Sequence, residues 1–286
     1  MIRKSQLFLA VAALVGMNAA MAACNTTQWG QGSVTAVVGT PTAGNPTTGD
    51  ADGVVRRYSG QCGLRAVAPA NYVQDGLPSA EPNFIARFYV FAGVTGGTAK
   101  VFNALNTAAA GSTFSVDWNG TGFDFKTGAG ATAFTIAAPG VAPFNNKWYA
   151  VELKYTDSTD TVSAKVKGNA TGAEATGSAA GFTVAGPDTV QFGFVSGTAT
   201  GEIHVDAYES RRSTDIGRLC RGDANADLSR NSADLITIRN EILTAGVTLG
   251  TGQVDCNEDG SILSSDQICV RNMVLAGNAA LCTVEQ

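Results

Sequence analysis

The sequence predicts a mainly β protein, in which an antiparallel β-sandwich is followed by a small all-α unit. Between residues 84 and 209, several segments alternate apolar and polar residues with a period of two, and glycine-containing turns separate them. After residue 216, two segments instead carry apolar residues at helical spacing. We therefore assign residues 23–215 to the sandwich and residues 216–286 to the small domain.

The clearest strand covers residues 147–155, where Tyr149, Val151, Leu153 and Tyr155 share one face. Residues 162–166, 190–194 and 203–207 alternate in the same way. Residues 84–91 are apolar on both faces, which predicts a central strand. Residues 39–52 and 168–181 lack apolar residues that could pack, so we expect two long exposed loops there.

The first 22 residues have the organisation of a signal peptide. Arg3 and Lys4 precede an apolar stretch that is too short to span a bilayer, and Ala20-Met21-Ala22 is a small-residue cleavage site. Residues 21–24 also loosely resemble a lipobox, which leaves a lipid-anchored form as the alternative. Both alternatives place the mature protein outside a bacterial cell or at its surface.

The charge balance disfavours two classes of partner. The formal net charge is −5, and removal of a basic leader makes the mature chain more acidic. An acidic chain disfavours nucleic acid and anionic membrane as partners. No other apolar stretch is long enough for a membrane span.

All six cysteines follow the leader, and an even number in an exported chain predicts disulfides. Two lie far upstream and four lie in the tail. This distribution favours a Cys24–Cys62 bridge and two bridges within the tail, and three tail pairings remain open. The tail cysteines are Cys220, Cys256, Cys269 and Cys282.

Three stretches of the large domain carry a resemblance: RRYSGQCGLRA, NYVQDGLPSAEPNFIARFYVF and GEIHVDAYESRR. They resemble concanavalin A-like (laminin G-like) jelly-roll domains of secreted bacterial proteins. The resemblance implies carbohydrate binding or a structural role. Aromatic residues that would stack on sugar rings are candidates for the first role: Trp118, Trp148, Tyr149 and Tyr155.

A glycoside hydrolase is the alternative function for the sandwich. Period two places Glu202, His204 and Asp206 on one strand face. This arrangement vaguely resembles the paired carboxylates of jelly-roll glucanases, so Glu202 and Asp206 are the candidate catalytic residues. The same three residues also suit the solvated face of an edge strand.

The small domain holds a duplicated acidic pattern. DANADLSRNSAD begins at Asp223, and DCNEDGSILSSD begins at Asp255. Oxygen-bearing residues at positions 1, 3, 5, 7, 9 and 12 have the spacing of an EF-hand Ca²⁺ loop, because a hard cation needs six to eight oxygens. The pattern predicts two Ca²⁺ ions, with these ligands: Asp223, Asn225, Asp227, Ser229, Asn231, Asp234, Asp255, Asn257, Asp259, Ser261 and Asp266.

Two positions depart from the EF-hand pattern. Leu228 stands at position 6, where glycine is usual, and would be strained if the loop requires positive φ. Leu263 stands at position 9 and offers no side-chain oxygen. The predicted loops are therefore not chemically identical.

Matching helices follow the two loops. Ile236, Ile238 and Ile242 align with Ile268, Val270 and Val274, and apolar residues at this spacing give each helix a buried face. Two loop–helix repeats, with no helix before either loop, resemble the type I dockerin module. The resemblance implies attachment to a cohesin-like domain, and self-association is the alternative. Dockerins would contact their partner through the residues here numbered Ser232, Ala233, Arg239, Asn240, Ser264, Ser265, Arg271 and Asn272.

Overall fold

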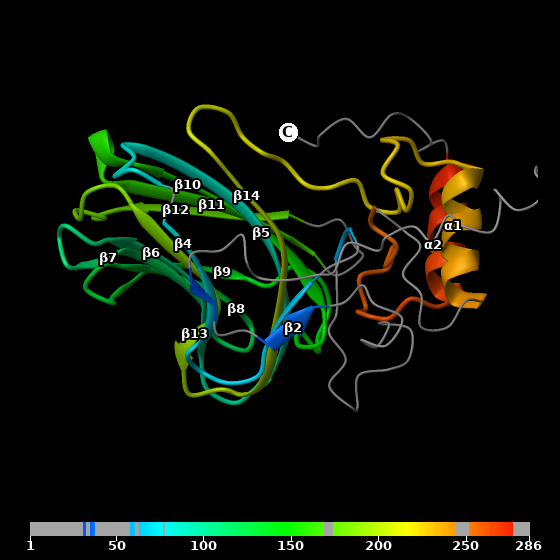
Figure 1. Ribbon diagram of the computed structural model, residues 1–286, viewed down its shortest axis with the longest axis horizontal. Coiled ribbons are helices and arrows are strands. Elements are labelled where there is room, and N and C mark those ends of the chain that lie inside the picture. Colours follow the sequence, from blue (N-terminus) through cyan, green and yellow to red (C-terminus); the bar gives the residue numbers. More distant parts are fainter. Residues whose placement is uncertain are drawn as a thin grey trace, which may run out of the picture.

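The computed structural model describes residues 31–32, 35–37, 58–60, 63–76, 78–168, 174–243 and 252–276. Two seven-stranded antiparallel sheets face each other, and two helices lie together beyond one end of the sandwich (Figure 1). This architecture confirms the predicted fold class. The predicted leader, the loop over residues 39–52, Cys24, Cys62 and Cys282 lie outside the described residues.

Sheet A has the strand order β1-β4-β13-β6-β7-β8-β9. Its strands are β1 (Gln31–Gly32), β4 (Asn71–Asp75), β6 (Ala99–Asn106), β7 (Gly111–Trp118), β8 (Gly122–Thr127), β9 (Thr132–Ala137) and β13 (Thr189–Gly197). The predicted strand over residues 190–194 is therefore confirmed inside this sheet.

Sheet B has the strand order β12-β11-β10-β5-β14-β3-β2. Its strands are β2 (Thr35–Val37), β3 (Leu64–Ala66), β5 (Asn83–Thr95), β10 (Trp148–Thr156), β11 (Thr161–Gly168), β12 (Glu174–Ala180) and β14 (Thr200–Arg211). A short 3-10 turn, η2 (Asp157–Thr159), joins β10 to β11. The doubly apolar segment, β5, lies in the middle of the sheet, as its sequence predicts.

The core lies between the sheets and is rich in aromatic rings. Phe88 of β5 stacks on Phe102 of β6, with ring centroids 4.9 Å apart, and so joins the two sheets. Tyr149, Val151, Leu153 and Tyr155 all face this core, which confirms the face predicted for β10. Burial of apolar area on this scale is the main force that closes a sandwich.

Two expectations about the sandwich are wrong. Residues 174–180 form strand β12 instead of loop, because their small residues pair with β11 and let the sheets approach. A Cβ on Gly177 would lie 2.7 Å from the Phe134 ring. The strand with Glu202 and Asp206 is not an edge strand either, because β14 lies between β5 and β3.

The four aromatic residues considered for sugar stacking are also buried. Trp118, Tyr149 and Tyr155 point into the core. Trp148 points to the outer face of sheet B, where it packs with Tyr58 and Tyr89 beneath the tail. None of the four rings offers a face to a ligand in this structure.

The tail contains α1 (Ser232–Leu243) and α2 (Ser264–Leu275), which pack side by side (Figure 1). Ile238 and Val270 are fully buried between them, as expected. Ile236 and Ile268 are instead about half exposed, at 53% and 48%. The helices thus bury a narrower face than their spacing predicts. None of the helices described here is long and apolar enough to cross a membrane.

Candidate metal centre in two acidic loops

In the first loop, the terminal aspartates accept hydrogen bonds from the loop backbone. Asp223 Oδ1 accepts from the Asp227 N–H at 3.1 Å, and its Oδ2 accepts from the Leu228 N–H at 2.9 Å. Asp234 Oδ1 accepts from the Ala224 N–H at 2.8 Å, and its Oδ2 accepts from the Asn231 N–H at 2.8 Å. Positions 1 and 12 therefore close the loop around its own backbone.

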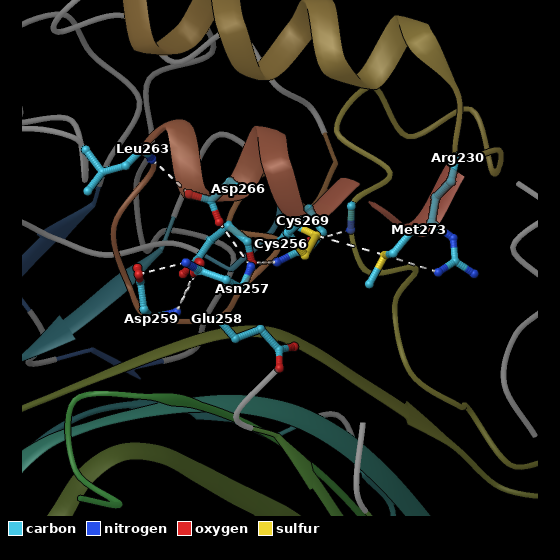
Figure 2. Close-up of a disulfide and its surroundings, with 12 residues drawn as sticks. Arg230, Cys256, Asn257, Glu258, Asp259, Leu263, Asp266, Cys269 and Met273 are labelled. Atoms are coloured by element: carbon cyan, nitrogen blue, oxygen red, sulfur yellow. Dashed lines mark hydrogen bonds between the residues drawn. A yellow bond between two sulfur atoms is a disulfide. The ribbon is translucent and has the colours of Figure 1, made fainter. Parts of the chain in front are cut away.

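The second loop repeats most of this arrangement, and Figure 2 shows the bonds that Asp266 accepts. The donor at position 3 is common to both loops, because the Asn225 N–H also donates to Asp234 Oδ1, at 3.3 Å. Asp255 Oδ1 and Oδ2 accept from the N–H groups of Asp259, at 3.1 Å, and Gly260, at 2.7 Å. Asp266 Oδ1 accepts from the Asn257 N–H at 3.0 Å, and its Oδ2 accepts from the Leu263 N–H at 2.8 Å. The internal repeat in the sequence is thus a repeat in structure.

The middle positions also match. Asn225 Nδ2 donates to Asp227 Oδ2 at 2.9 Å, and the equivalent bond from Asn257 to Asp259 measures 2.8 Å. Asp227 Oδ1 accepts from the Ser229 N–H at 2.8 Å, and Asp259 Oδ1 accepts from the Ser261 N–H at 2.9 Å. Positions 3, 5 and 7 therefore make the same hydrogen bonds in both loops.

Position 9 differs between the loops. Asn231 Oδ1 accepts from the Ala233 N–H at 2.7 Å and so caps α1. Leu263 stands at the corresponding place before α2 and is half exposed. Any oxygen supplied to an ion at position 9 of the second loop must therefore come from the backbone or from water.

Position 6 has a positive φ in both loops. Leu228 has φ of 65°, and Gly260 in the second loop has φ of 84°. Both loops therefore need the left-handed region, and only the second has the residue suited to it. Position 4 is left-handed in both loops too, at Ala226 and Glu258.

The carboxylates at positions 1 and 12 of each loop have raised pKa values. Burial is the first cause for Asp255 and Asp266, and the charges of neighbouring aspartates add to it. The pKa of Asp266 rises to about 6, and that of Asp255 lies well above its usual range. The pKa values of Asp223 and Asp234 are raised for the same two reasons. A cation within each loop would offset this repulsion.

The chemistry of the donors indicates which ion fits. Among the described residues, no three His, Cys, Asp or Glu side chains come together as a metal-binding group. The donors of each loop are instead mixed oxygens from carboxylate, amide, hydroxyl and backbone groups. A set that contains only oxygen donors fits Ca²⁺ and does not fit Zn²⁺, which prefers nitrogen and sulfur.

A disulfide fixes the second loop to its helix. Cys256, at position 2 of the loop, is bonded to Cys269 in α2 (Figure 2). Cys220 is also disulfide-bonded, and its partner lies outside the described residues. Of the three pairings left open in the tail, only the one that contains the Cys256–Cys269 bridge remains. The Cys24–Cys62 bridge stays a prediction.

Five of the eight residues that dockerins would use are exposed on the helix pair. Ser232, Arg239, Ser264 and Arg271 are exposed, whereas Ala233 and Ser265 are partly buried. Asn240 is partly buried and Asn272 is exposed. Four apolar residues are exposed as well, although helical spacing favours burial of the isoleucines: Ile236, Leu243, Ile268 and Leu275. With the exposed serines and arginines they form one stripe along each helix.

The candidate catalytic carboxylates are engaged within the sandwich. Glu202 binds Arg65 at 2.6 Å and lies 2.8 Å from His204 Nε2. Burial works to raise the pKa of Glu202, but these two partners outweigh it and leave the pKa below its usual range. A glycosidase acid needs a raised pKa. Asp206 Oδ2 accepts from the N–H groups of Tyr58 and Ser59, at 2.6 and 3.0 Å.

A groove of about 350 Å³ lies on the outer face of sheet B. Its floor is two rows of polar side chains that cross three neighbouring strands, β10, β11 and β12, and Asp215 forms one wall. The residues of each row are paired across the three strands by the strand register. They face outward because the residues between them, Leu153 on β10 and Ala164 on β11, point into the core. The rows are Glu152, Lys165 and Thr176, then Lys154, Ser163 and Ser178.

Comparison with known proteins finds no family model that matches this chain and no curated protein that matches it. Several solved structures align with the sandwich. A Trypanosoma rangeli sialidase in complex with the inhibitor DANA shares 13% identity and a TM-score of 0.38, over 54% of this chain and 26% of that one. The aligned part thus spans about a quarter of the sialidase.

Two further structures align over more of their own length. Cellulose induced protein Cip1 shares 15% identity and a TM-score of 0.44, over 68% of this chain and 95% of that one. Lectin II from Ulex europaeus shares 11% identity and a TM-score of 0.35, over 55% and 86%. All three scores are low, so the fold class rests on the two sheets themselves: an antiparallel β-sandwich with a C-terminal helix pair.

Proposed function

We propose that the tail binds two Ca²⁺ ions and attaches this exported protein to a partner domain of the cohesin type. The observation that carries the proposal is the duplication itself. Both loops hold their aspartates by the same hydrogen bonds, and both following helices expose the same stripe. Ser232, Ile236, Arg239 and Leu243 on α1 correspond to Ser264, Ile268, Arg271 and Leu275 on α2.

The exposed isoleucines and leucines support attachment to another protein. An isolated apolar side chain on a surface is ordinary, but two matching rows of them beside arginines have the composition of an interface centre. Export is supported by the Cys256–Cys269 bridge, because disulfides persist in oxidising compartments. The tail would then serve as a connector, and the sandwich would be the part that it carries.

The experiment has two stages. Calorimetric titration of the full chain with calcium chloride should show uptake of two ions, and absence of heat at millimolar calcium refutes the calcium site. Pull-down with a cohesin-type domain and sedimentation of the chain alone then separate partner binding from self-association. The double variant Ile236→Ser, Ile268→Ser should lose either interaction, whereas Val141→Ser, an exposed apolar residue of the sandwich, should keep it.

For the sandwich, we propose carbohydrate binding in the groove of sheet B. Lysine donors, carboxylate acceptors and hydroxyls stand beside one another on its floor, and such a set suits the adjacent hydroxyls of a sugar ring. Aromatic stacking plays no part, because the candidate rings are buried. Affinity electrophoresis against soluble polysaccharides tests this. Lys154→Ala should weaken retardation, and Lys100→Ala on sheet A should not.

Hydrolysis is the second candidate function for the sandwich. The engagement of Glu202 by Arg65 and His204 argues against it, since neither the geometry nor the pKa suits a general acid. Hydrolysis of a panel of β-glucans by the wild type and by Glu202→Gln decides the matter. Activity in the wild type that is lost in the variant would establish a glycoside hydrolase.

A further inference from the structure

We propose that the two calcium loops are unequal sites, and that Glu258 makes the second loop the tighter one by docking it on the sandwich. The inference rests on the calcium binding proposed above. The side-chain donors of the two loops differ at position 9, where Asn231 favours the first loop and Leu263 offers no oxygen. A tighter second loop must therefore owe its affinity to features other than its side-chain donors. The surroundings of the two loops differ most at positions 4 to 6.

In the first loop, positions 4 to 6 face solvent. Ala226, Asp227 and Leu228 are all exposed. In the second loop, position 4 is Glu258, which is 1% exposed, and position 6 is the buried Gly260. Positions 4 and 6 are therefore exposed in the first loop and buried in the second, while position 5 is exposed in both.

Glu258 makes three contacts with groups outside its loop. Its backbone oxygen accepts a hydrogen bond from the Trp148 N–H at 3.3 Å, at the start of β10. Its Oε1 accepts from the Tyr58 hydroxyl at 2.7 Å, across 200 residues of sequence. The carboxylate also forms a buried ion pair with Arg218. Figure 2 shows this side chain directed away from the metal loop and toward the sheet.

The surface that receives Glu258 is a densely packed aromatic cluster. Tyr58 stacks on Tyr89 with centroids 3.7 Å apart, and Trp148 meets Tyr58 edge-on at 5.5 Å. The Tyr89 hydroxyl accepts a hydrogen bond from the Leu219 N–H at 2.7 Å, which ties the segment before the first loop to the same cluster. Removal of one partner from a buried ion pair leaves an unpaired buried charge, which strongly destabilises the packing around it.

A docked loop has less conformational freedom to lose when it closes around an ion, so its affinity is higher. Two further features act in the same direction. Gly260 adopts its positive φ without strain, and the Cys256–Cys269 bridge holds the loop to α2. By linkage, calcium in the second loop must strengthen docking by the same factor by which docking strengthens calcium binding.

Calcium titration of the full chain tests the inference, with calorimetry and Trp fluorescence as readouts. We expect two binding events with dissociation constants separated by about tenfold or more. Asp255→Ala should remove the tighter event, and Asp223→Ala should remove the weaker one. Glu258→Gln keeps the side-chain shape but loses the ion pair, and should weaken only the tighter event, by roughly 5-fold or more.

Two controls keep the test informative. Tyr58→Phe removes one hydrogen bond to Glu258 with the ring retained, and should weaken the tighter event in the same direction as Glu258→Gln. Glu174→Gln removes a carboxylate on β12 and should change neither event. Equal sites in the wild type, or an unchanged tighter event in Glu258→Gln, would overturn the inference. Absence of any calcium uptake would instead refute the proposed function.

Discussion

Replacing Leu228 with glycine should stabilise the protein, although it removes an apolar side chain. Leu228 has φ of 65°, and a residue with a Cβ loses about 1–2 kcal/mol in the left-handed region. Glycine avoids that strain but adds freedom to the unfolded chain, which costs about 0.5–1 kcal/mol. Leu228 is 61% exposed, so little buried area is lost. The expected net gain is about 0.5–1 kcal/mol.

Scanning calorimetry of the calcium-loaded chain measures this gain. For a chain of this size, it corresponds to a rise in Tm of roughly 1–4 °C. Leu228→Ala is the matched control, because alanine keeps the strain and should stay near the wild type. The reciprocal change, Gly260→Ala at φ of 84°, should lower Tm. If Leu228→Gly proves no more stable than Leu228→Ala, position 6 carries no strain and our account of the first loop is wrong.

The remaining predictions concern ions, protons and the disulfide. Excess EDTA should lower the Tm of the tail, because an ion at ~100 times its dissociation constant adds about 2.7 kcal/mol; an unchanged Tm and circular dichroism spectrum would contradict this. In EDTA, Tm should fall between pH 5 and pH 7. The pKa of Asp266 is raised to about 6 and that of Asp255 is raised too, so their stabilising effect is complete below the unfolded value near 3.8 and is lost as pH rises through 6. With saturating calcium, Tm should instead rise between pH 5 and pH 7, since the ion needs ionised carboxylates. A Tm that rises over this range in EDTA would count against the raised pKa values. Finally, the double variant Cys256→Ala, Cys269→Ala should lose about 3 kcal/mol in urea unfolding, as expected for a closed loop of this length, and a loss well under 1 kcal/mol would show that the bridge adds little.

Patterns between near neighbours in the chain could be interpreted correctly from the sequence. The period-two face of β10 and the doubly apolar β5 follow from strand geometry alone. The acidic spacing likewise predicted a duplicated loop, and the hydrogen bonds of Asp223 and Asp255 repeat in the two copies. Each of these features depends on residues a few positions apart.

Where prediction was wrong, the deciding contact came from a distant segment. The small and polar residues 174–180 predict a loop, yet they pair with β11, and Phe134 covers Gly177. Glu202 seemed free on an edge, yet Arg65 approaches from β3 and holds it. Ile236 seemed to belong to a packing face, but α2 covers only the neighbouring side of its helix.

The sequence by itself determined five of the strands, the paired helices and the duplication of the acidic loops, because periodicity and spacing act over short distances along the chain. Only the tertiary structure decided what covers the outer face of sheet B. Tyr58 and Glu258 lie 200 residues apart and meet in one buried hydrogen bond. Such a contact depends on how complete sheets and helices pack, and no local pattern in either segment specifies it.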